Sequence, residues 1–264
     1  MKRIIAALLA VLILVVSPIV CFAAEENSGT CGQNLTWRYD ESTKTLIIEG
    51  TGSMTNWFSN RQVPWKHLRL EATSLSLPEG LTSVGDYAFY GFENISELYI
   101  PSTVTRVGHG AFSIWKSLKE VNITNGVKEL GGWVFASCTK LEKITFPSSL
   151  TFIDYECFMN CPYLMDVTIP STVTSLGRKS FGTLAGHAIN YDMILRGVPG
   201  SNVQSFASTY FLNFVSVYSK SEAAAGVYEA FKGLDSEEFT LSEMDFNGDG
   251  IISTKDSLTA KLAS

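Results

Sequence analysis

Histidine is scarce in this sequence, and the residue patterns of several common catalytic sites are missing. The three histidines, His67, His109 and His187, show neither a His-Glu-x-x-His nor a His-x-His spacing, which excludes the usual zinc hydrolase motifs. The chain also lacks a Gly-x-Ser-x-Gly nucleophile elbow and a glycine-rich phosphate loop. A catalytic pair of carboxylates, as in glycosidases, leaves little local pattern and is not excluded by the absence of these motifs. We therefore predict that the chain is not an enzyme.

Basic residues are fewer than acidic ones. Lysine and arginine number 20 against 26 aspartates and glutamates, a net charge of −6. Without Lys2 and Arg3 the net charge is −8. An acidic balance argues against a nucleic-acid surface and against binding to an anionic membrane.

Long apolar runs are confined to the first two dozen residues, which have the features of an export signal. Lys2 and Arg3 give a positive start, and the apolar run from Ile4 to Val16 is short for a bilayer span. Cys21 and Ala23 are small residues at the positions that a signal peptidase reads. We predict a signal peptide over residues 1–23 and a secreted mature protein. A lipid anchor on Cys21 is disfavoured because Val20 precedes it.

A repeat of 23 residues organises the middle of the chain. Phenylalanine recurs at this interval at Phe89, Phe112, Phe135, Phe158 and Phe181. One column of apolar pairs keeps the same register at Leu75/Leu77, Leu98/Ile100, Val121/Ile123, Ile144/Phe146 and Val167/Ile169. A second column consists of Leu81/Val84, Val104/Val107, Val127/Leu130, Leu150/Ile153 and Val173/Leu176, followed by glycine at Gly85, Gly108, Gly131 and Gly177. Such a fixed period predicts a solenoid of stacked coils.

Each repeat can be interpreted as one coil. The alternation in Leu98-Tyr99-Ile100 predicts a short strand with two side chains inward and one outward. Pro101 ends this strand because proline cannot donate to the next ladder bond. We expect the second apolar pair and its glycine to turn the chain, and Phe112 and its equivalents to pack under the next coil. Five coils would then bury one continuous apolar core, which offers no obvious catalytic cleft.

Four cysteines follow the export signal, namely Cys31, Cys138, Cys157 and Cys161. An even number in an exported chain is compatible with disulfides. However, Cys138 and Cys161 occupy the column of Phe92 and Trp115, and Cys157 lies in a column of small residues. We therefore expect buried free cysteines, although adjacent coils would bring Cys138 and Cys161 close enough for a bond.

The repeat resembles the BspA-like bacterial surface leucine-rich repeats. The residues that carry this resemblance are Leu141-x-x-Ile144-x-Phe146-Pro147, Leu150-x-x-Ile153 and Cys157-Phe158-x-x-Cys161. The segments that resemble the family's N-terminal β-hairpin cap and last coil are Cys31-Gly32-x-Asn34-Leu35-x-Trp37, Thr45-Leu46-x-Ile48-x-Gly50-x-Gly52 and Ile194-x-x-Gly197-x-Pro199-Gly200. Thr124 in place of proline and Asp154 in place of glycine depart from the pattern. The resemblance covers about residues 30–217 and implies a curved solenoid for adhesion or protein binding.

The chain becomes polar and acidic after Ser219, with 9 acidic and 4 basic residues in the rest of the sequence. The run from Asp245 to Asp256 places oxygen ligands at positions 1, 3, 5 and 12 of a loop, with Gly250 at the sharp turn. Oxygen ligands at this spacing select calcium. The predicted ligands of Ca²⁺ are Asp245, Asn247, Asp249, the carbonyl of Ile251, Ser253 and Asp256.

Two features of this loop resemble the dockerin version of the EF-hand. Asp256 is shorter than the usual glutamate at position 12, and Ile252 is apolar and expected to point inward. The resemblance implies docking onto a cohesin module of a scaffold protein, as in a cellulosome. The residues implied to contact the partner are Thr254, Lys255, Leu258, Lys261 and Leu262. A dockerin has two such loops, whereas this chain has one, preceded by expected helices over 223–234 and 237–244.

The outward positions of the first strand form ladders that recur in every coil. One ladder is polar with a single aromatic residue and consists of Ser76, Tyr99, Asn122, Thr145 and Thr168. The next is mostly acidic and consists of Ser74, Glu97, Glu120, Lys143 and Asp166. These ladders are either a solvated sheet face or a contact surface. Exposed aromatic residues stack on sugars, so Trp57, Trp65 and Trp115 are also of interest, although the column of Trp115 favours a core position.

Together these observations predict a β-rich leucine-rich-repeat solenoid of five 23-residue coils with a β-hairpin cap and a small α-helical calcium-binding C-terminal segment. The expected units are a signal peptide (1–23), an N-terminal β cap (24–70), repeats with a C-terminal cap coil (71–218) and a dockerin-like segment (219–264). The predicted function is non-catalytic binding or adhesion at the cell surface, with calcium-dependent tethering to a cohesin-bearing scaffold. The alternatives are a calcium-stabilised adhesin without a cohesin partner and a carbohydrate-binding accessory protein.

Overall fold

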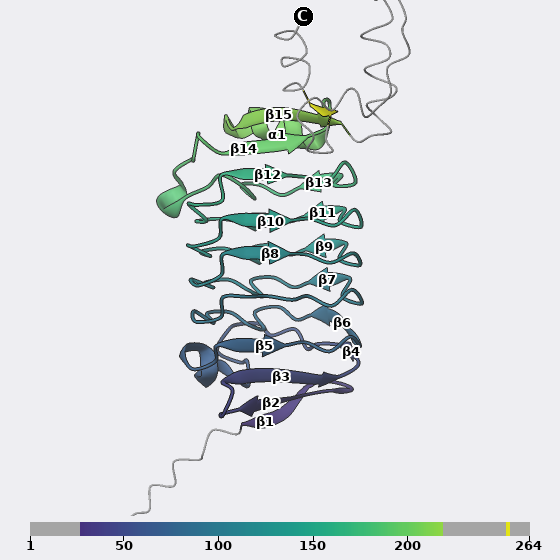
Figure 1. Cartoon of the computed structure of the whole chain (residues 1–264), viewed down its shortest axis with the longest axis vertical. Coiled ribbons are helices and arrows are strands. Elements are labelled where there is room, and N and C mark those ends of the chain that lie inside the picture. The colour runs from purple at the N-terminus through teal and green to yellow at the C-terminus, as the bar shows by residue number, and fades with distance from the viewer. Residues whose placement is uncertain (1–26, 219–251, 254–264) are drawn as a thin grey trace, which may run out of the picture.

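The computed structural model describes residues 27–218 and 252–253. Figure 1 shows a stack of coils in which short strands lie above one another in two columns, with the N-terminal strands at one end and β15 at the other. The predicted signal peptide lies outside the described residues, as does the C-terminal segment apart from Ile252 and Ser253.

The N-terminal end of the stack is a set of antiparallel strands. β1 (Ser28–Gly32) pairs with β2 (Leu35–Asp40), which pairs with β3 (Thr45–Gly50). Along β2 the side chains alternate between buried and exposed positions, so that one face covers the apolar end of the coils. β3 then pairs in parallel with β5 (Ser74–Ser76), which begins the stack.

The first column of strands contains the short strand predicted in the repeats, except in the coil of Leu98 to Ile100. After β5 its members are β8 (Glu120–Asn122), β10 (Lys143–Thr145), β12 (Asp166–Thr168), β14 (Ile194–Gly197) and β15 (Asn213–Tyr218). β8 and β10 pair in parallel. A parallel bridge between Tyr99 and Asn122 joins the preceding coil to β8. In that coil Leu98 and Ile100 are buried and Tyr99 is 58% exposed, as the alternation predicted, but Tyr99 forms only an isolated bridge and no strand spans these three residues.

The second apolar pair of each repeat does more than turn the chain, because it forms a second parallel sheet. Its strands are β4 (Gly52–Ser53), β6 (Leu81–Val84), β7 (Arg106–Val107), β9 (Glu129–Leu130), β11 (Phe152–Ile153) and β13 (Ser175–Leu176). Val107, Leu130 and Ile153 lie in register from coil to coil and are fully buried. The backbone groups that we expected in a turn are therefore satisfied between neighbouring coils.

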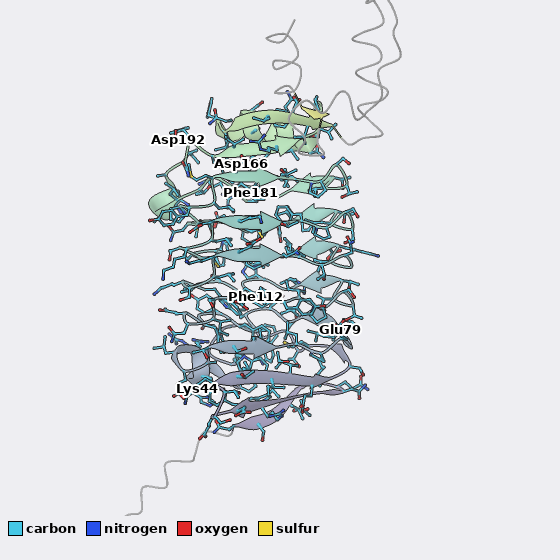
Figure 2. The ribbon with its side chains drawn as sticks, viewed as in Figure 1. Lys44, Glu79, Phe112, Asp166, Phe181 and Asp192 are labelled. Carbon is cyan, nitrogen blue, oxygen red and sulfur yellow. The ribbon has the colours of Figure 1, made fainter. Side chains whose placement is uncertain are left out.

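The phenylalanine column forms the centre of the core. Consecutive rings from Phe89 to Phe181 are stacked, with centroids 4.8–5.7 Å apart and interplanar angles of 8–16°. Trp65 extends this stack toward the N-terminal cap, with its centroid 5.6 Å from Phe89. Figure 2 shows Phe112 and Phe181 inside the stack of coils. The predicted packing of phenylalanine on phenylalanine is confirmed.

Helical segments occur where the repeat is interrupted. η1 (Lys66–Leu70) precedes the first coil, and η2 (Ala185–His187) lies in the linker before the last one. α1 (Asn202–Tyr210) connects the parallel strands β14 and β15 and buries Val203, Phe206 and Ala207. This i, i+3, i+4 pattern is that of an amphipathic helix, which we had not predicted in the last coil. β16 (Ile252–Ser253) pairs antiparallel with β15.

The four described cysteines are free and buried. The Sγ atoms of Cys138 and Cys161 donate to the carbonyls of Phe112 and Phe135, at 3.4 and 3.1 Å. Burial raises the pKa of Cys161 to about 12 and places the pKa of Cys138 and Cys157 well above its ordinary value. These thiols therefore behave as small apolar core residues at neutral pH, as the repeat indicated.

Candidate binding surfaces

The predicted ladders lie on the outer face of the first column of strands, which we call the strand face. All ten ladder residues are exposed on this face, namely Ser74, Ser76, Glu97, Tyr99, Glu120, Asn122, Lys143, Thr145, Asp166 and Thr168. The parallel pairing of β10 with β8 sets Thr145 beside Asn122, and the hydroxyl of Tyr99 donates to Glu79 Oε1 at 3.0 Å. The strand face is therefore a continuous polar surface with one exposed ring.

The second ladder is mostly acidic in composition, and cations compensate two of its three carboxylates. Lys143 Nζ lies 2.8 Å from Glu120 Oε1. Arg196 on β14 binds Asp166 through two hydrogen bonds, from Nε and Nη2, each of 2.7 Å. Bidentate pairs of this kind hold both side chains in a fixed geometry. Figure 2 marks Asp166 near the end of the stack that carries this pair.

Arg196 is a strand-face residue that the repeat period does not reveal. It lies opposite Thr168 in the register of β12 and β14. The two positions are 28 residues apart instead of 23, because the linker that contains η2 lengthens this coil. Only the pairing of β12 with β14 shows that Arg196 lies on the strand face.

The tryptophans that we considered for stacking on sugars are not exposed. Trp57, Trp65 and Trp115 are buried. The indole Nε1 of Trp65 donates to the carbonyl of Ala88, and that of Trp115 donates to Phe89, both at 2.7 Å. The core position expected for Trp115 is confirmed, and the hypothesis that Trp57 or Trp65 contacts a ligand is wrong.

A different set of aromatic residues gathers where the chain leaves the second sheet. We call it the turn-side stripe and define it as Tyr87, His109, Trp133 and Tyr155, one residue from each of four successive coils. The ring of His109 lies 5.2 Å from Tyr87, 4.9 Å from Trp133 and 5.6 Å from Tyr155, measured between centroids. The rings are inclined to that of His109 by 45–70°, so they form a faceted cluster and not a flat platform.

Two residues of the stripe adopt a backbone conformation that favours glycine. Tyr87 and Trp133 have φ values of 58° and 59°, and Gly110 has a φ of 60° at the equivalent position of the coil between them. A residue with a Cβ costs about 1–2 kcal/mol in this region. Trp133 remains 36% exposed, so burial offsets less of this strain than it would for a core residue. Glu156 and Lys179, at the equivalent positions of the next two coils, also have positive φ values of 51° and 55°, so this conformation belongs to the turn of every coil and is not evidence of binding.

His109 is half-buried among the rings of the stripe. Desolvation by its aromatic neighbours lowers its pKa below the ordinary 6.5; Asp86 and Asp154 oppose this shift, whereas Arg106 supports it. Asp86 Oδ1 accepts the backbone N–H of His109 at 2.8 Å, and the Tyr155 hydroxyl lies 3.4 Å from the ring Nδ1. The imidazole is therefore mainly neutral at neutral pH.

This lowered pKa predicts a loss of stability in mild acid. Between the pKa of folded His109 and 6.5 the unfolded chain binds more protons, so the free energy of unfolding should fall as the pH drops below about 6.5 and level off once folded His109 is itself protonated. His109→Asn removes this titration. We expect urea unfolding at pH 7.5, 6.5 and 5.5 to show a smaller loss for the variant than for the natural chain. Equal losses would contradict the prediction.

The predicted calcium site lies outside the described residues except for Ser253, which belongs to β16. The residues expected to contact a cohesin, from Thr254 to Leu262, lie outside them as well. Within residues 27–218 and 252–253, no cluster of three or more His, Cys, Asp or Glu side chains is arranged to hold a metal ion. No helix in this described part of the chain is long and apolar enough to cross a membrane.

Comparisons with solved structures find leucine-rich-repeat proteins of low sequence identity. The T. pallidum leucine-rich repeat protein is 22% identical, with a TM-score of 0.43 over 64% of this chain and 71% of that one. A leucine-rich repeat protein from Eubacterium ventriosum is 18% identical, with a TM-score of 0.41 over 72% and 73%. A leucine-rich cell surface protein from Faecalibacterium prausnitzii is 18% identical, with a TM-score of 0.40 over 64% and 54%.

Comparison with curated proteins gives no match. The family model of the BspA type leucine-rich repeat region matches residues 68–185 in six copies. These residues contain the phenylalanine column and both ladders of the strand face, and the coil count of five stays a prediction. Residues 68–185 are therefore a leucine-rich repeat region of the BspA type.

Proposed function

We propose that this chain is a secreted, non-catalytic binding protein that acts at or outside the cell surface and recognises a protein or surface ligand through its strand face. The observation that carries the proposal is the continuous polar face built from equivalent positions of successive coils. A stack of parallel strands presents such side chains on a rigid surface at low conformational cost. The family match and the cell-surface neighbour support this proposal.

The strand face can be tested with two variants of matched chemistry. Thr145 on β10 and Ser175 on β13 both carry exposed hydroxyls, one on the strand face and one on the second sheet. Replacing either with Lys adds one charge and a longer side chain. We expect Thr145→Lys to abolish binding of the labelled mature protein to cells or extracellular material of its source, and Ser175→Lys to leave it unchanged. Equal binding by all three proteins would overturn the strand face as the binding surface.

The proposal includes a calcium-dependent tether in the C-terminal segment. Its support is the spacing of oxygen ligands from Asp245 to Asp256, which would hold Ca²⁺ through carboxylate, amide and carbonyl oxygens. Isothermal titration of the chelator-treated chain with CaCl₂ tests this. We expect a Kd in the range of about 10⁻⁶ to 10⁻⁴ M, no measurable heat for Asp245→Ala and normal binding for Asp235→Ala, an acidic control outside the loop. Absence of heat from the natural chain would refute calcium binding.

Attachment to a scaffold is a separate step of the same proposal. Purified cohesin modules should bind the full chain in CaCl₂ and release it in chelator. Substitution of Thr254 and Lys255, at loop positions 10 and 11, should weaken this binding without changing the calcium titration. If calcium binds and no cohesin does, the calcium-stabilised adhesin replaces the tethered protein as the better description.

A further inference from the structure

The turn-side stripe lies on a different surface from the strand face. Its residues follow the strands of the second sheet: Tyr87 comes three residues after β6 ends, and Tyr155 two residues after β11 ends. A ligand held here would not compete for Tyr99, Asn122 or Thr145. The inference below therefore goes beyond the function proposed for the strand face.

The orientation of Trp133 is fixed by contacts with the neighbouring coil. Its indole Nε1 donates to Glu156 Oε2 at 2.6 Å, and the side chain of Glu156 is only 8% exposed. A Cβ atom on Gly132 would lie 2.8 Å from the ring of Tyr155, so glycine at that position leaves room for this ring against the backbone. Trp133 and Tyr155 are thus held in place before any ligand arrives, which lowers the entropic cost of binding.

Three carboxylates lie around the stripe: Asp86 and Glu156 are paired with the more exposed guanidinium groups of Arg106 and Arg178, and Asp154 accepts the backbone N–H of Tyr155 at 2.7 Å. Asp86 accepts from Arg106 at 3.1 Å, and the Arg106 side chain is 39% exposed against 26% for Asp86. Arg178 Nη2 lies 3.8 Å from buried Glu156 Oε1 while 70% of its own side chain is exposed. A ligand that reaches Trp133 therefore meets the cation before the carboxylate.

We propose that the turn-side stripe binds an acidic oligosaccharide, with a sugar ring packed on Trp133 and Tyr155 and a sugar carboxylate paired with Arg178. Sugar rings present C–H faces to aromatic rings and hydroxyl groups at their edges. The stripe offers a matching combination of apolar and polar groups. The aromatic ring faces are bordered by the Tyr155 hydroxyl, His109 Nδ1 and the Arg178 guanidinium. The inclined rings suit a short soluble chain and not a flat polysaccharide surface, which would require coplanar rings.

Titration of the full chain with a trimer of galacturonic acid, and with the neutral galactose trimer as control, tests this proposal. We expect the acidic trimer to bind, the neutral trimer to bind at least about tenfold more weakly, and added salt to weaken the acidic trimer selectively. No heat and no tryptophan fluorescence change with the acidic trimer would overturn the proposal. Equal affinity for both trimers would overturn the role of Arg178.

Variants separate the two contacts. Trp133→Gly should weaken binding at least about tenfold and should fold, because Gly110 already occupies the equivalent position with the same φ. Arg178→Gln should remove the preference for the acidic trimer, whereas Arg38→Gln, in an exposed ion pair of the N-terminal cap, should keep it. Unchanged binding by Trp133→Gly would overturn the site. Thr145→Lys on the strand face should bind the trimer with unchanged affinity. The trimer titration therefore tests the turn-side stripe independently of the strand face.

Discussion

Replacing Phe135 with Ala should lower the free energy of unfolding by about 3–5 kcal/mol. Phe135 is fully buried, and its ring is stacked between Phe112 and Phe158 with centroid distances of 5.7 and 5.5 Å. The substitution removes contacts with both neighbouring coils at once, and rings fixed by their own neighbours can collapse into the gap only partly. Urea unfolding followed by circular dichroism measures the change.

Tyr163→Ala is the control for this experiment. Tyr163 is also an aromatic residue of the repeats, but 62% of its surface is exposed, so we expect a change within about 0.5 kcal/mol. Solenoid stability depends on contacts between nearest neighbours, and the Phe135 variant should therefore also broaden the transition as the coils on its two sides uncouple. A loss below about 1 kcal/mol would mean that the phenylalanine column does not hold the stack together.

The first column of strands and the phenylalanine stack could be predicted because burial imposes the same residue type at the same position of every coil. Phe112 and Phe135 occupy equivalent environments, so the 23-residue period records their packing directly. The second sheet was harder to predict. All its strands except β6 are two residues long, such as Arg106–Val107, and too short to show an alternating pattern, so the sequence indicates only a turn at the apolar pair.

The candidate sites depend on features that a repeat pattern conceals. Arg196 does not follow the 23-residue spacing, because the linker that contains η2 lengthens its coil. The turn-side stripe alternates from coil to coil between two adjacent columns: Tyr87 and Trp133 share one with Gly110, and His109 and Tyr155 share the other with Gly132. Neither column is aromatic as a whole, and the 23-residue period therefore does not show that the four rings cluster. The one available hint was Gly110, whose place in a column shared with Trp133 indicates a positive φ at both positions.

The calcium segment is the opposite case, because its prediction depends entirely on local spacing. Six candidate ligand positions within twelve residues can be predicted without any knowledge of the fold. The antiparallel pairing of β16 with β15 brings two residues of this loop to the last strand of the solenoid. Spacing along the chain predicts the ligands of an ion. Only the strand pairing shows that Ile252 and Ser253 lie beside β15.

Substituting Gly126 with Ala should destabilise the fold by about 3 kcal/mol or more, although it adds only one methyl group. Gly126 has a φ of 135°, in a region that side chains rarely adopt, and its backbone N–H donates to Ser149 Oγ at 3.0 Å. An added Cβ would lie 1.9 Å from the carbonyl oxygen of Ser102 in the neighbouring coil. Because that obstacle is backbone, relief requires the two coils to move apart.

Gly186→Ala separates the two contributions to this cost. Gly186 in η2 also has a positive φ, of 69°, but an added Cβ would have no atom within 4 Å. Only the backbone strain remains there, and we expect a loss of about 1 kcal/mol in the same urea experiment. The difference between the two variants then reflects the clash with Ser102 of the neighbouring coil together with the rarer φ of Gly126. If Gly126→Ala cost no more than Gly186→Ala, the coils would be separated widely enough to admit a methyl group, and the close stacking that aligns both ladders of the strand face would be wrong.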